Sequence, residues 1–397
     1  MGMSTSQADR GTVVIAHPSP DLYGSDRVLL ESVSGLVNAG YRVTAALPAE
    51  GPLAPALRQR GAQVLFVGSP VLRKSALRPA GLVRLIAETL RSLPSTWRVL
   101  SRERPVLLVV NTITIPLWSL VGRLRGIPVV CHVHEAEKSA KPVLRRLLYL
   151  PLLLANALVA NSRFSLGVLT ESWAALGRRG TIVYNGVPGP DAPQSPRGDL
   201  TDPVQLLFIG RLSPRKGPQV ALEALRLLNA RHPGRYFLNL LGAVFPGYEW
   251  FEQQLRDFVA AEGLEDRVSF LGFDPDVWGH LAESDIVLVP STVDEPFGNT
   301  AVEAMLAQRP LVVSKTSGLC EAADGYASAI LVTPNDPEAI VCGVTQLVGA
   351  WPEVIEQTSG DRALAISKHA AKTYQREFTV AVEAAMGPPG RNGSRKA

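Results

Sequence analysis

The sequence predicts an α/β protein with two Rossmann-like, doubly wound parallel-sheet domains. Short apolar runs alternate with helical patterns along the 397 residues, which is the order of βαβ units in a parallel sheet. The alternation breaks once, between Gly186 and Pro203, where five prolines and three glycines replace apolar periodicity. We therefore expect an N-terminal domain over residues 11–187, a linker over 188–203 and a C-terminal domain over 204–370.

The first half opens with a strand over Thr12–Ala16 and a helix over Asp26–Asn38. In that helix apolar residues recur three and four apart, and Gly40 ends it. The same patterns predict strands over Arg42–Leu47, Gln63–Val67, Val106–Val110, Pro128–His132, Ala157–Ala160 and Thr181–Tyr184, and helices over Pro52–Arg60, Leu82–Leu93, Ile115–Arg125, from Lys141 onward, and over Ser165–Leu176.

The second half repeats this alternation and ends in a helix over 371–386, which we expect to pack back towards the N-terminal domain. Residues 387–397 are polar and rich in Gly and Pro, and predict a disordered tail. Strands are predicted over Val204–Ile209, Tyr236–Leu241, Val268–Leu271, Ile286–Val289, Leu311–Val313 and Ala329–Val332, and helices over Pro218–Ala230, Trp250–Glu262, Val277–Ala282, from Asn299, and over Pro337–Gly349. Two such domains are expected to face each other across a cleft, because ligands of open parallel sheets bind beyond the carboxyl ends of the strands.

Composition limits the class of protein. A hydrophobic content of 46% with 19% charged residues is globular, and a formal net charge of +4 suits an anionic partner. Three cysteines, Cys131, Cys320 and Cys342, are an odd number without metal-ligand spacing, which favours reduced thiols in a cytoplasm. The longest apolar stretch, Leu147–Ala160, is shorter than the ~20 residues of a membrane span. We expect a cytoplasmic protein, with peripheral contact at the inner membrane face left open.

The stretch Asp285–Met305 carries the most informative pattern. A buried strand is followed by a loop with Glu295 and then by a helix that contains Glu303. Asn299 or Thr300 is expected to cap this helix, and the N–H groups of its first turn favour a phosphate. Carboxylates on both sides would accept hydrogen bonds from sugar hydroxyls. The alternative is that both glutamates are ordinary surface charges.

The second domain begins with FIGRLSPRKGPQ, in which a strand ends at Gly210 and a helix starts near Pro218. Arg211 and Lys216 lie in the loop between them. Two cations beside a helix N-terminus can clamp a diphosphate, because arginine forks onto oxygens and lysine adds a point charge. Solvated basic residues near a helix start are the alternative interpretation.

The segments GRLSPRKG, VSFLGF, SDIVLVPS, EPFGNTAVEAM and ILVTPNDPEAI resemble, in this order, the C-terminal half of the retaining GT-B glycosyltransferases of the group-1 (family 4) class. Glu295 and Glu303 match the Glu-x7-Glu motif of that family. The N-terminal half resembles the same family through Gly24-Ser25, GYRVTAALP, HVHE, VANSRFS and YNGV, so the resemblance covers about residues 12–380.

This resemblance implies a nucleotide-diphosphate-sugar donor held mainly by the C-terminal domain and an acceptor held by the N-terminal domain. It also implies retention of anomeric configuration and no required metal or other cofactor. Arg211 and Lys216 would neutralise the donor diphosphate, Glu303 would accept from the ribose hydroxyls, and Glu295 would contact the donor sugar. Backbone N–H groups near the sugar and phosphate would come from Phe297, Gly298, Asn299 and Thr300.

In the first domain, the resemblance places Gly24 and Ser25 in a loop that approaches the donor phosphate or the acceptor. Relatives carry two glycines there, whereas this chain has Ser25. His134, in the CHVHE segment, would line the donor sugar or orient the acceptor, with a capped strand end as the alternative; Glu135 is a further candidate. No double-displacement nucleophile is assigned, since retention in this class is explained by same-face attack in which the phosphate takes the acceptor proton.

Two departures from the family pattern are expected near the donor pocket: Gln308-Arg309-Pro310, and Ser317-Gly318 in place of two glycines. They leave the donor sugar open. Rival functions are a GT-B nucleotide-sugar epimerase and a catalytically silent nucleotide-sugar binding homologue. Nucleic acid is not expected as a partner, because the basic residues lack interleaved aromatic side chains.

Basic stretches also mark the acceptor side. Arg73 and Lys74 form one with Arg78, and Lys141, Arg145 and Arg146 precede the apolar residues 147–154. The second stretch suits an anionic membrane or a lipid-linked acceptor, and a solvated helix face is the alternative.

Overall fold

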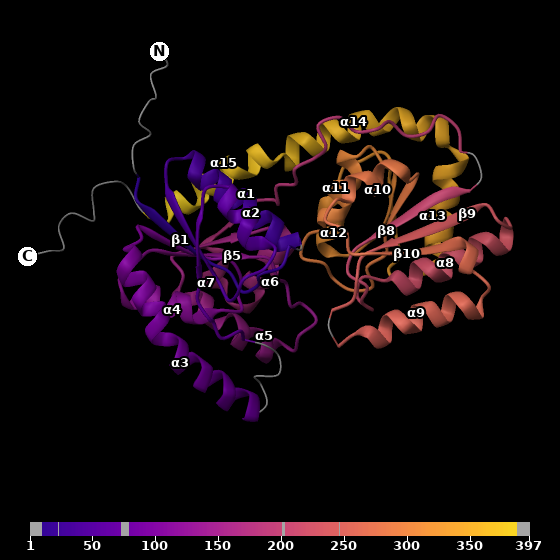
Figure 1. The fold of residues 1–397 in the computed structure, drawn as a ribbon. Coiled ribbons are helices and arrows are strands. Elements are labelled where there is room, and N and C mark those ends of the chain that lie inside the picture. The colour runs from indigo at the N-terminus through magenta and orange to yellow at the C-terminus, as the bar shows by residue number, and fades with distance from the viewer. Residues whose placement is uncertain (1–9, 23, 73–78, 201–202, 246, 387–397) are drawn as a thin grey trace, which may run out of the picture. The chain divides into compact units, whose positions relative to one another are not determined.

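The computed structural model describes residues 10–22, 24–72, 79–200, 203–245 and 247–386. The basic stretch at Arg73, Lys74 and Arg78 and the predicted tail over 387–397 lie outside these ranges. The chain forms two compact units (Figure 1). The first contains the residues up to Gly186 together with those from Ala371 onward, and the second spans Val187–Ala370.

The described part of the first unit contains a seven-stranded, fully parallel sheet in the order β3-β2-β1-β4-β5-β6-β7. The central strands are apolar on both faces, as expected for a parallel sheet covered by helices on both sides. The strands are β1 (Thr12–Ala16), β2 (Arg42–Leu47), β3 (Gln63–Phe66), β4 (Leu107–Val110), β5 (Val129–Val133), β6 (Ala157–Ala160) and β7 (Gly180–Ile182).

Helices cover both faces of this sheet and build a core on each side. On one side, α15 packs against α1 (Figure 1). Gly35 of α1 leaves room there for the backbone of Gln375, and the hydroxyls of Ser32 and Tyr374 are 2.5 Å apart. The helices are α1 (Gly24–Asn38), α2 (Leu53–Gln59), α3 (Pro79–Glu103), α4 (Pro116–Leu124), α5 (Pro142–Tyr149), the 3₁₀ helix η2 (Leu150–Leu154), α6 (Arg163–Ser172), α7 (Ala174–Gly177) and α15 (Ala371–Ala384).

The second unit has a six-stranded parallel sheet in the order β10-β9-β8-β11-β12-β13 within the described residues. Its strands are β8 (Val204–Ile209), β9 (Tyr236–Leu241), β10 (Val268–Gly272), β11 (Ile286–Val289), β12 (Leu311–Ser314) and β13 (Ala329–Val332). Its helices are α8 (Pro218–Arg231), α9 (Glu249–Ala261), the 3₁₀ helix η3 (Glu265–Arg267), α10 (Val277–Glu283), α11 (Asn299–Leu306), α12 (Ser317–Ala322), α13 (Pro337–Gly349) and α14 (Trp351–His369). The predicted fold class is confirmed by these two parallel-sheet α/β units.

Several helices differ from the sequence-based expectation. Helix α12 was not predicted, and the helix expected over Ser165–Leu176 is divided into α6 and α7. Helix α3 does not end at Leu93 but continues through Pro94 to Glu103, and its C-terminal half buries Thr96 and Leu100. Proline removes one backbone hydrogen bond, and the packing beyond it holds the helix together. Helix α14 was not predicted, because three of its buried residues, Thr358, Asp361 and His369, are polar and interrupt the apolar spacing.

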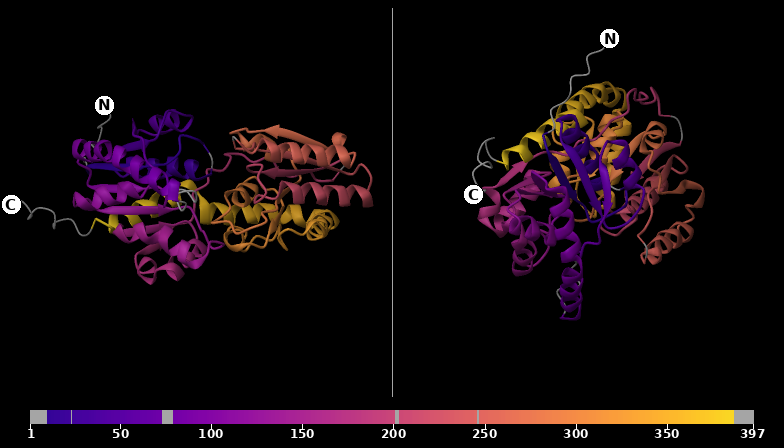
Figure 2. Two further views of the ribbon diagram at one scale, coloured as in Figure 1. Left: turned by 90° about the horizontal axis from the view of Figure 1, so that it is seen from below. Right: turned by 60° about the vertical axis from the view of Figure 1, so that its left-hand side comes forward.

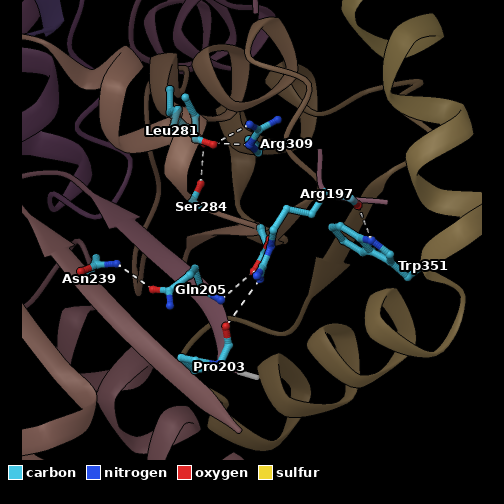
Figure 3. Close-up of polar contacts among 10 residues, drawn as sticks. Arg197, Pro203, Gln205, Asn239, Leu281, Ser284, Arg309 and Trp351 are labelled. Atoms are coloured by element: carbon cyan, nitrogen blue, oxygen red, sulfur yellow. Dashed lines mark hydrogen bonds and ion pairs between the residues drawn. The ribbon is translucent and has the colours of Figure 1, made fainter. Parts of the chain in front are cut away.

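The segment expected to be a linker is tied to the second unit (Figure 3). Arg197 donates from Nε to Asp285 Oδ1 over 2.8 Å, and its carbonyl accepts from the Trp351 indole at 2.9 Å. Asp285 is buried and also accepts from the backbone N–H of Gln205 at 2.7 Å. High proline and glycine content therefore marks an irregular segment here that is nonetheless anchored.

Arg309 belongs to this anchored region, and the prediction that it lies near the donor pocket is wrong. It precedes β12, so it lies at the amino edge of the sheet, opposite the edge where ligands bind. Its buried guanidinium donates to the carbonyl of Leu281 at 2.7 Å (Figure 3). It also donates to the carbonyls of Ala282 and Gln194 at 2.8 and 2.9 Å. Burial lowers the pKa of Arg309 to about 10. Its role is to bind backbone carbonyls.

Candidate functional site

The strongest candidate site lies at the carboxyl ends of β8 and β11 in the second unit. These strands are neighbours at the point where the strand order reverses direction, since β9 follows β8 on one side and β12 follows β11 on the other. Such a switch point leaves a crevice between diverging loops and is where open α/β sheets bind ligands. The sequence-predicted residues Arg211, Lys216 and Glu295 all lie in the two loops that leave these strands.

Glycines allow these loops to approach one another closely. A Cβ added at Gly217, the residue before α8, would lie 1.9 Å from the carbonyl oxygen of Pro290, and its φ of 78° is in the left-handed region. A Cβ at Gly242 would lie 1.8 Å from the carbonyl oxygen of Gly210. The loop after β8 is thus held between the loops that follow β9 and β11.

Arg211 lies directly after Gly210 in this loop. Its guanidinium carbon is 3.2 Å from the centroid of the Phe245 ring, so the planar group stacks on an aromatic face. Such stacking stabilises the cation and restricts its orientation. Phe245 was not identified from the sequence, because it follows a different strand, β9.

Lys216 and Glu295 form an ion pair, with 2.9 Å between Lys216 Nζ and Glu295 Oε1. Ser291 donates its hydroxyl hydrogen to the same carboxylate oxygen at 3.0 Å. Glu295 is only 5% exposed. Burial acts to raise its pKa, but the charge and hydrogen bond of Lys216, the charge of Arg215 and the Ser291 hydroxyl outweigh burial, so the pKa is lowered. The carboxylate is therefore ionised, and Lys216 holds it.

Helix α11 starts beside this pair. Gly298, with a φ of 132°, is the N-cap, and no side chain caps the helix, so the expected capping by Asn299 or Thr300 is wrong. Asn299 and Thr300 are instead the first two helical residues, and Thr300 directs its hydroxyl at the Ile209 carbonyl, 3.5 Å away. A helix start without a side-chain cap is suited to an anion.

Phe297 lies just before α11 and Glu303 lies inside it, and both are buried. The Phe297 ring meets His369 edge-on, with 5.4 Å between centroids. Glu303 is 7% exposed, so the interpretation of this residue as an ordinary surface charge does not hold. A buried carboxylate on a helix that begins at a ligand-binding edge is more typical of a functional group.

The loop after β12 completes this edge, as the sequence departure at Ser317-Gly318 suggested. Ser317 donates its hydroxyl hydrogen to Asp294 Oδ1 at 2.7 Å, and Gly318 donates its N–H to the Glu295 carbonyl at 3.0 Å. A Cβ at Gly318 would lie 2.5 Å from that carbonyl oxygen. Close backbone packing thus fixes the loop that carries Glu295. Sequence reasoning assigned no role to Asp294.

The first unit contains a chain of three buried polar side chains, His17, Asp26 and Asn111, that ends at the half-buried His134. His17 Nε2 is 2.7 Å from Asp26 Oδ1, and His17 Nδ1 is 3.0 Å from Asn111 Nδ2. Asn111 Oδ1 is in turn 3.1 Å from His134 Nε2. His17, Asn111 and His134 each follow a strand directly, namely β1, β4 and β5. That shared position is the signal by which His17 and Asn111 could have been found.

The predicted residue Ser25 joins this chain through Asp26, to which its hydroxyl donates over 3.4 Å. Gly24 and Ser25 are the first two residues of α1, whereas the sequence placed them in a loop ahead of the helix. Burial, followed by the nearby His17, lowers the pKa of His134 to about 3, so His134 is neutral near pH 7. Glu135 accepts from the Thr112 hydroxyl, and burial raises its pKa.

Comparisons with known proteins agree with this arrangement. The family model described as Glycosyltransferase Family 4 matches residues 23–188, and the model described as Glycosyl transferases group 1 matches residues 194–354. A D-inositol 3-phosphate glycosyltransferase of Corynebacterium jeikeium is 36% identical over 165 residues, which are 40% of this chain and 39% of the relative. Glycogen synthase of Mycobacterium tuberculosis is 30% identical over 174 residues, 42% of this chain and 39% of the relative. The matched part thus spans about two fifths of the length of these curated relatives.

Solved structures resemble nearly the whole chain. Anabaena HepE in complex with UDP and glucose has a TM-score of 0.79 at 20% identity, covering 94% of this chain and 99% of that one. Sucrose-phosphate synthase of Thermosynechococcus elongatus has a TM-score of 0.73 at 17% identity, with 94% and 99% covered. At these identities the likeness concerns the fold, which is that of GT-B enzymes. Since the two family models describe one class and together match most of the sequence, this chain belongs to the group 1, family 4 glycosyltransferases.

Proposed function

We propose that the protein is a metal-independent, retaining hexosyltransferase that moves a sugar from a nucleotide-diphosphate-sugar to a hydroxyl of a glycan, lipid-linked or small-molecule acceptor. The observation that carries the proposal is the cluster of Arg211, Lys216 and Glu295 beside the uncapped start of α11. Two cations and a helix N-terminus suit a diphosphate, and a buried carboxylate suits sugar hydroxyls. HepE was solved with UDP and glucose, which supports a nucleotide-sugar donor here.

In the proposed reaction the bond between the anomeric carbon and the phosphate oxygen breaks, and a bond to the acceptor oxygen forms on the same face. The acceptor proton passes to the departing phosphate oxygen. Arg211 and Lys216 stabilise the charge that develops on the diphosphate, which lowers the barrier because the cations are fixed in advance. Backbone N–H groups from Phe297 to Thr300 assist them. Glu295 positions the sugar, and Glu303 binds the ribose.

In the first unit, His134 and the segment at Gly24 and Ser25 are proposed to face the acceptor or the donor phosphate. Biosynthesis of a polysaccharide or another glycan in the cytoplasm is the corresponding setting. An anionic membrane is a further proposed partner. No helix among the described residues is long and apolar enough to cross a membrane.

The test is thermal unfolding of the protein with UDP, GDP, ADP and their sugars. A ligand at about 100 times its dissociation constant adds about 2.7 kcal/mol of apparent stability. One nucleotide should stabilise the wild type but neither Arg211→Ala nor Lys216→Ala. Arg256→Ala is the matched control, because Arg256 also stacks on a phenylalanine ring in the same unit, 4.1 Å from the centroid of Phe270.

The outcome also separates rival functions. No stabilisation by any nucleotide diphosphate would refute the proposal. Turnover of the donor without an acceptor would indicate an epimerase, and binding without turnover over a broad acceptor panel would indicate a silent homologue. Addition of a chelator should leave transfer unchanged.

A further inference from the structure

We propose that the first unit docks on an anionic lipid bilayer through α3 and α4, and that a pocket beside these helices takes up one hydrocarbon chain of a lipid. The inference deepens the membrane contact included in the proposed function, and rests on it only for its biological setting. Its surface lies on α3, α4 and η2 at the edge of the first unit, where α4 packs against both α3 and η2 (Figure 1).

The pocket has a volume of about 450 Å³, within the ~300–1,000 Å³ typical of ligand pockets. Its walls come from Leu85 of α3, from Leu117 and Leu120 of α4, and from η2, which contributes Leu150, Pro151, Leu153 and Leu154. The one polar side chain among its lining residues, Thr89, donates its hydroxyl hydrogen to the Leu85 carbonyl at 2.7 Å. The lining of the pocket is therefore almost entirely apolar, which favours hydrocarbon.

An exposed apolar stripe on α3 adjoins the pocket. Leu82, Ile86 and Leu90 are exposed by 50%, 50% and 64%, and Val83 and Trp97 extend the stripe. These positions share one face because their spacings follow the helical period. Figure 2 shows the first half of α3 extending away from its sheet, which leaves this face uncovered by the described residues of the unit. A stripe of large apolar side chains in contact with water marks an interaction surface.

The positive charge of the helices around this surface indicates that its partner is an anionic bilayer. Helices α3, α4 and α5 carry seven arginines and two glutamates. One glutamate, Glu88, is paired with Arg84 at 2.8 Å, and the other, Glu103, is 11% exposed and accepts from Thr44 of β2. By helical spacing, the four arginines of α3 follow the apolar stripe on the side away from the pocket. They are Arg84, Arg91, Arg98 and Arg102.

Around α3 the order is thus pocket, apolar stripe and arginines. This arrangement matches a helix that lies in the plane of a bilayer, with apolar side chains at the acyl boundary and basic ones at anionic headgroups. The η2 segment also refines the sequence-based expectation for residues 147–154. Leu148 and Leu152 are buried in the core, whereas Leu150 is exposed at the pocket.

The first arm of the test measures binding of the full chain to phosphatidylcholine vesicles with and without phosphatidylglycerol, at low salt, by flotation. Binding should require the anionic lipid. Arg91→Gln with Arg98→Gln should weaken it about fivefold per arginine. The matched control is the double variant Arg231→Gln and Arg256→Gln in helices of the second unit, which makes the same change in charge. Its vesicle binding should stay within about twofold of that of the wild type. Absence of binding to anionic vesicles overturns the inference.

The second arm tests the pocket. Leu120→Trp fills it and should weaken binding by about tenfold, since displaced methylenes are worth about 0.8 kcal/mol each. Leu331→Trp, at a similarly exposed leucine of the second unit, is the matched control. Vesicles with brominated acyl chains should quench the Trp97 fluorescence, a signal that Trp97→Phe removes. Wild-type or tighter binding of Leu120→Trp overturns uptake of a chain, and no quenching at Trp97 overturns insertion of the apolar stripe.

Nucleotide stabilisation is measured in the same variants. Absence of vesicle binding by the wild type, with its nucleotide stabilisation intact, removes the docking inference alone. Vesicle binding without any nucleotide stabilisation removes the donor-site proposal alone.

Discussion

Lys216 and Glu295 meet at 2.9 Å, although they come from loops after two different strands, β8 and β11. The pair therefore joins the proposed phosphate clamp to the proposed sugar-binding carboxylate. A lysine that holds a buried glutamate keeps that side chain ionised and oriented before a ligand arrives.

Removal of Lys216 should destabilise the second unit. Lys216→Met leaves the buried Glu295 carboxylate without its closest cation, which should lower the free energy of unfolding by about 1–3 kcal/mol. Glu295→Gln in the same chain should restore part of this loss, because the uncompensated charge is gone. Urea unfolding of the four proteins of this cycle measures the coupling. If the changes in unfolding free energy of the two single variants added strictly in the double variant, the proposed coupling between Lys216 and Glu295 would be contradicted.

The pH dependence of stability should report the same carboxylate. The folded pKa of Glu295 is lowered, so its contribution to stability is present above the unfolded value of about 4.3 and is lost as pH falls through the lower folded value. The stability difference between wild type and Glu295→Gln should therefore shrink on acidification below about pH 4.3. If the stability difference between the wild type and Glu295→Gln instead grew as the pH fell, the lowered pKa of Glu295 would be contradicted.

Gly217→Ala should disrupt the contact between the start of α8 and the loop after β11. Its Cβ would overlap the Pro290 carbonyl at 1.9 Å, in addition to the cost of a positive φ, which is about 1 kcal/mol. Gly263 has a φ of 63° and no heavy atom within 4 Å of a Cβ, so Gly263→Ala isolates the conformational cost. We expect Gly217→Ala, but not Gly263→Ala, to abolish stabilisation by the nucleotide. Equal melting shifts for both variants would refute the steric argument.

Buried neutral histidines should make the protein acid-sensitive. Burial lowers the pKa of His134 to about 3 and that of His369 to about 4, and it lowers the pKa of His132 as well. Each takes up a proton on unfolding below about pH 6.5, which costs up to about 1.4 kcal/mol per pH unit. His369→Phe should flatten the pH dependence of the second unit's unfolding transition. If the slope of the unfolding free energy against pH, measured between about pH 5 and 6, were the same in His369→Phe as in the wild type, the prediction would be contradicted.

The polar chain of the first unit predicts one tautomer of His134. Starting from Asp26 as acceptor, His17 carries its hydrogen on Nε2, Asn111 donates to His17 Nδ1, and the Asn111 carbonyl oxygen accepts from His134 Nε2–H. Nitrogen chemical shifts of the labelled histidine rings measure this directly. Asn111→Ala should convert His134 into a mixture of tautomers, while a wild-type His134 protonated on Nδ1 would refute the assignment.

Much of the fold could be predicted from the sequence, because parallel strands buried on both faces appear as short apolar runs. Val204–Ile209, Ile286–Val289 and Pro337–Gly349 have the predicted bounds. The strand order could not be obtained this way, and it is this order that brings the loops after β8 and β11 together. Lys216 and Glu295 were each identified as candidates, whereas their pairing depends on loop geometry that Gly217 and Gly318 allow.

The anchoring of the proline-rich segment has a consequence for proteolysis. Its carbonyls at Pro190, Gln194 and Arg197 accept hydrogen bonds from Arg362, Arg309 and Trp351 of the second unit. A protease needs several residues of chain in extended, unrestrained form, and here each carbonyl must first be released from a side chain held elsewhere in the unit. Cleavage around Gln194 should therefore follow the opening of the second unit, so that this segment resists digestion for as long as that unit stays folded.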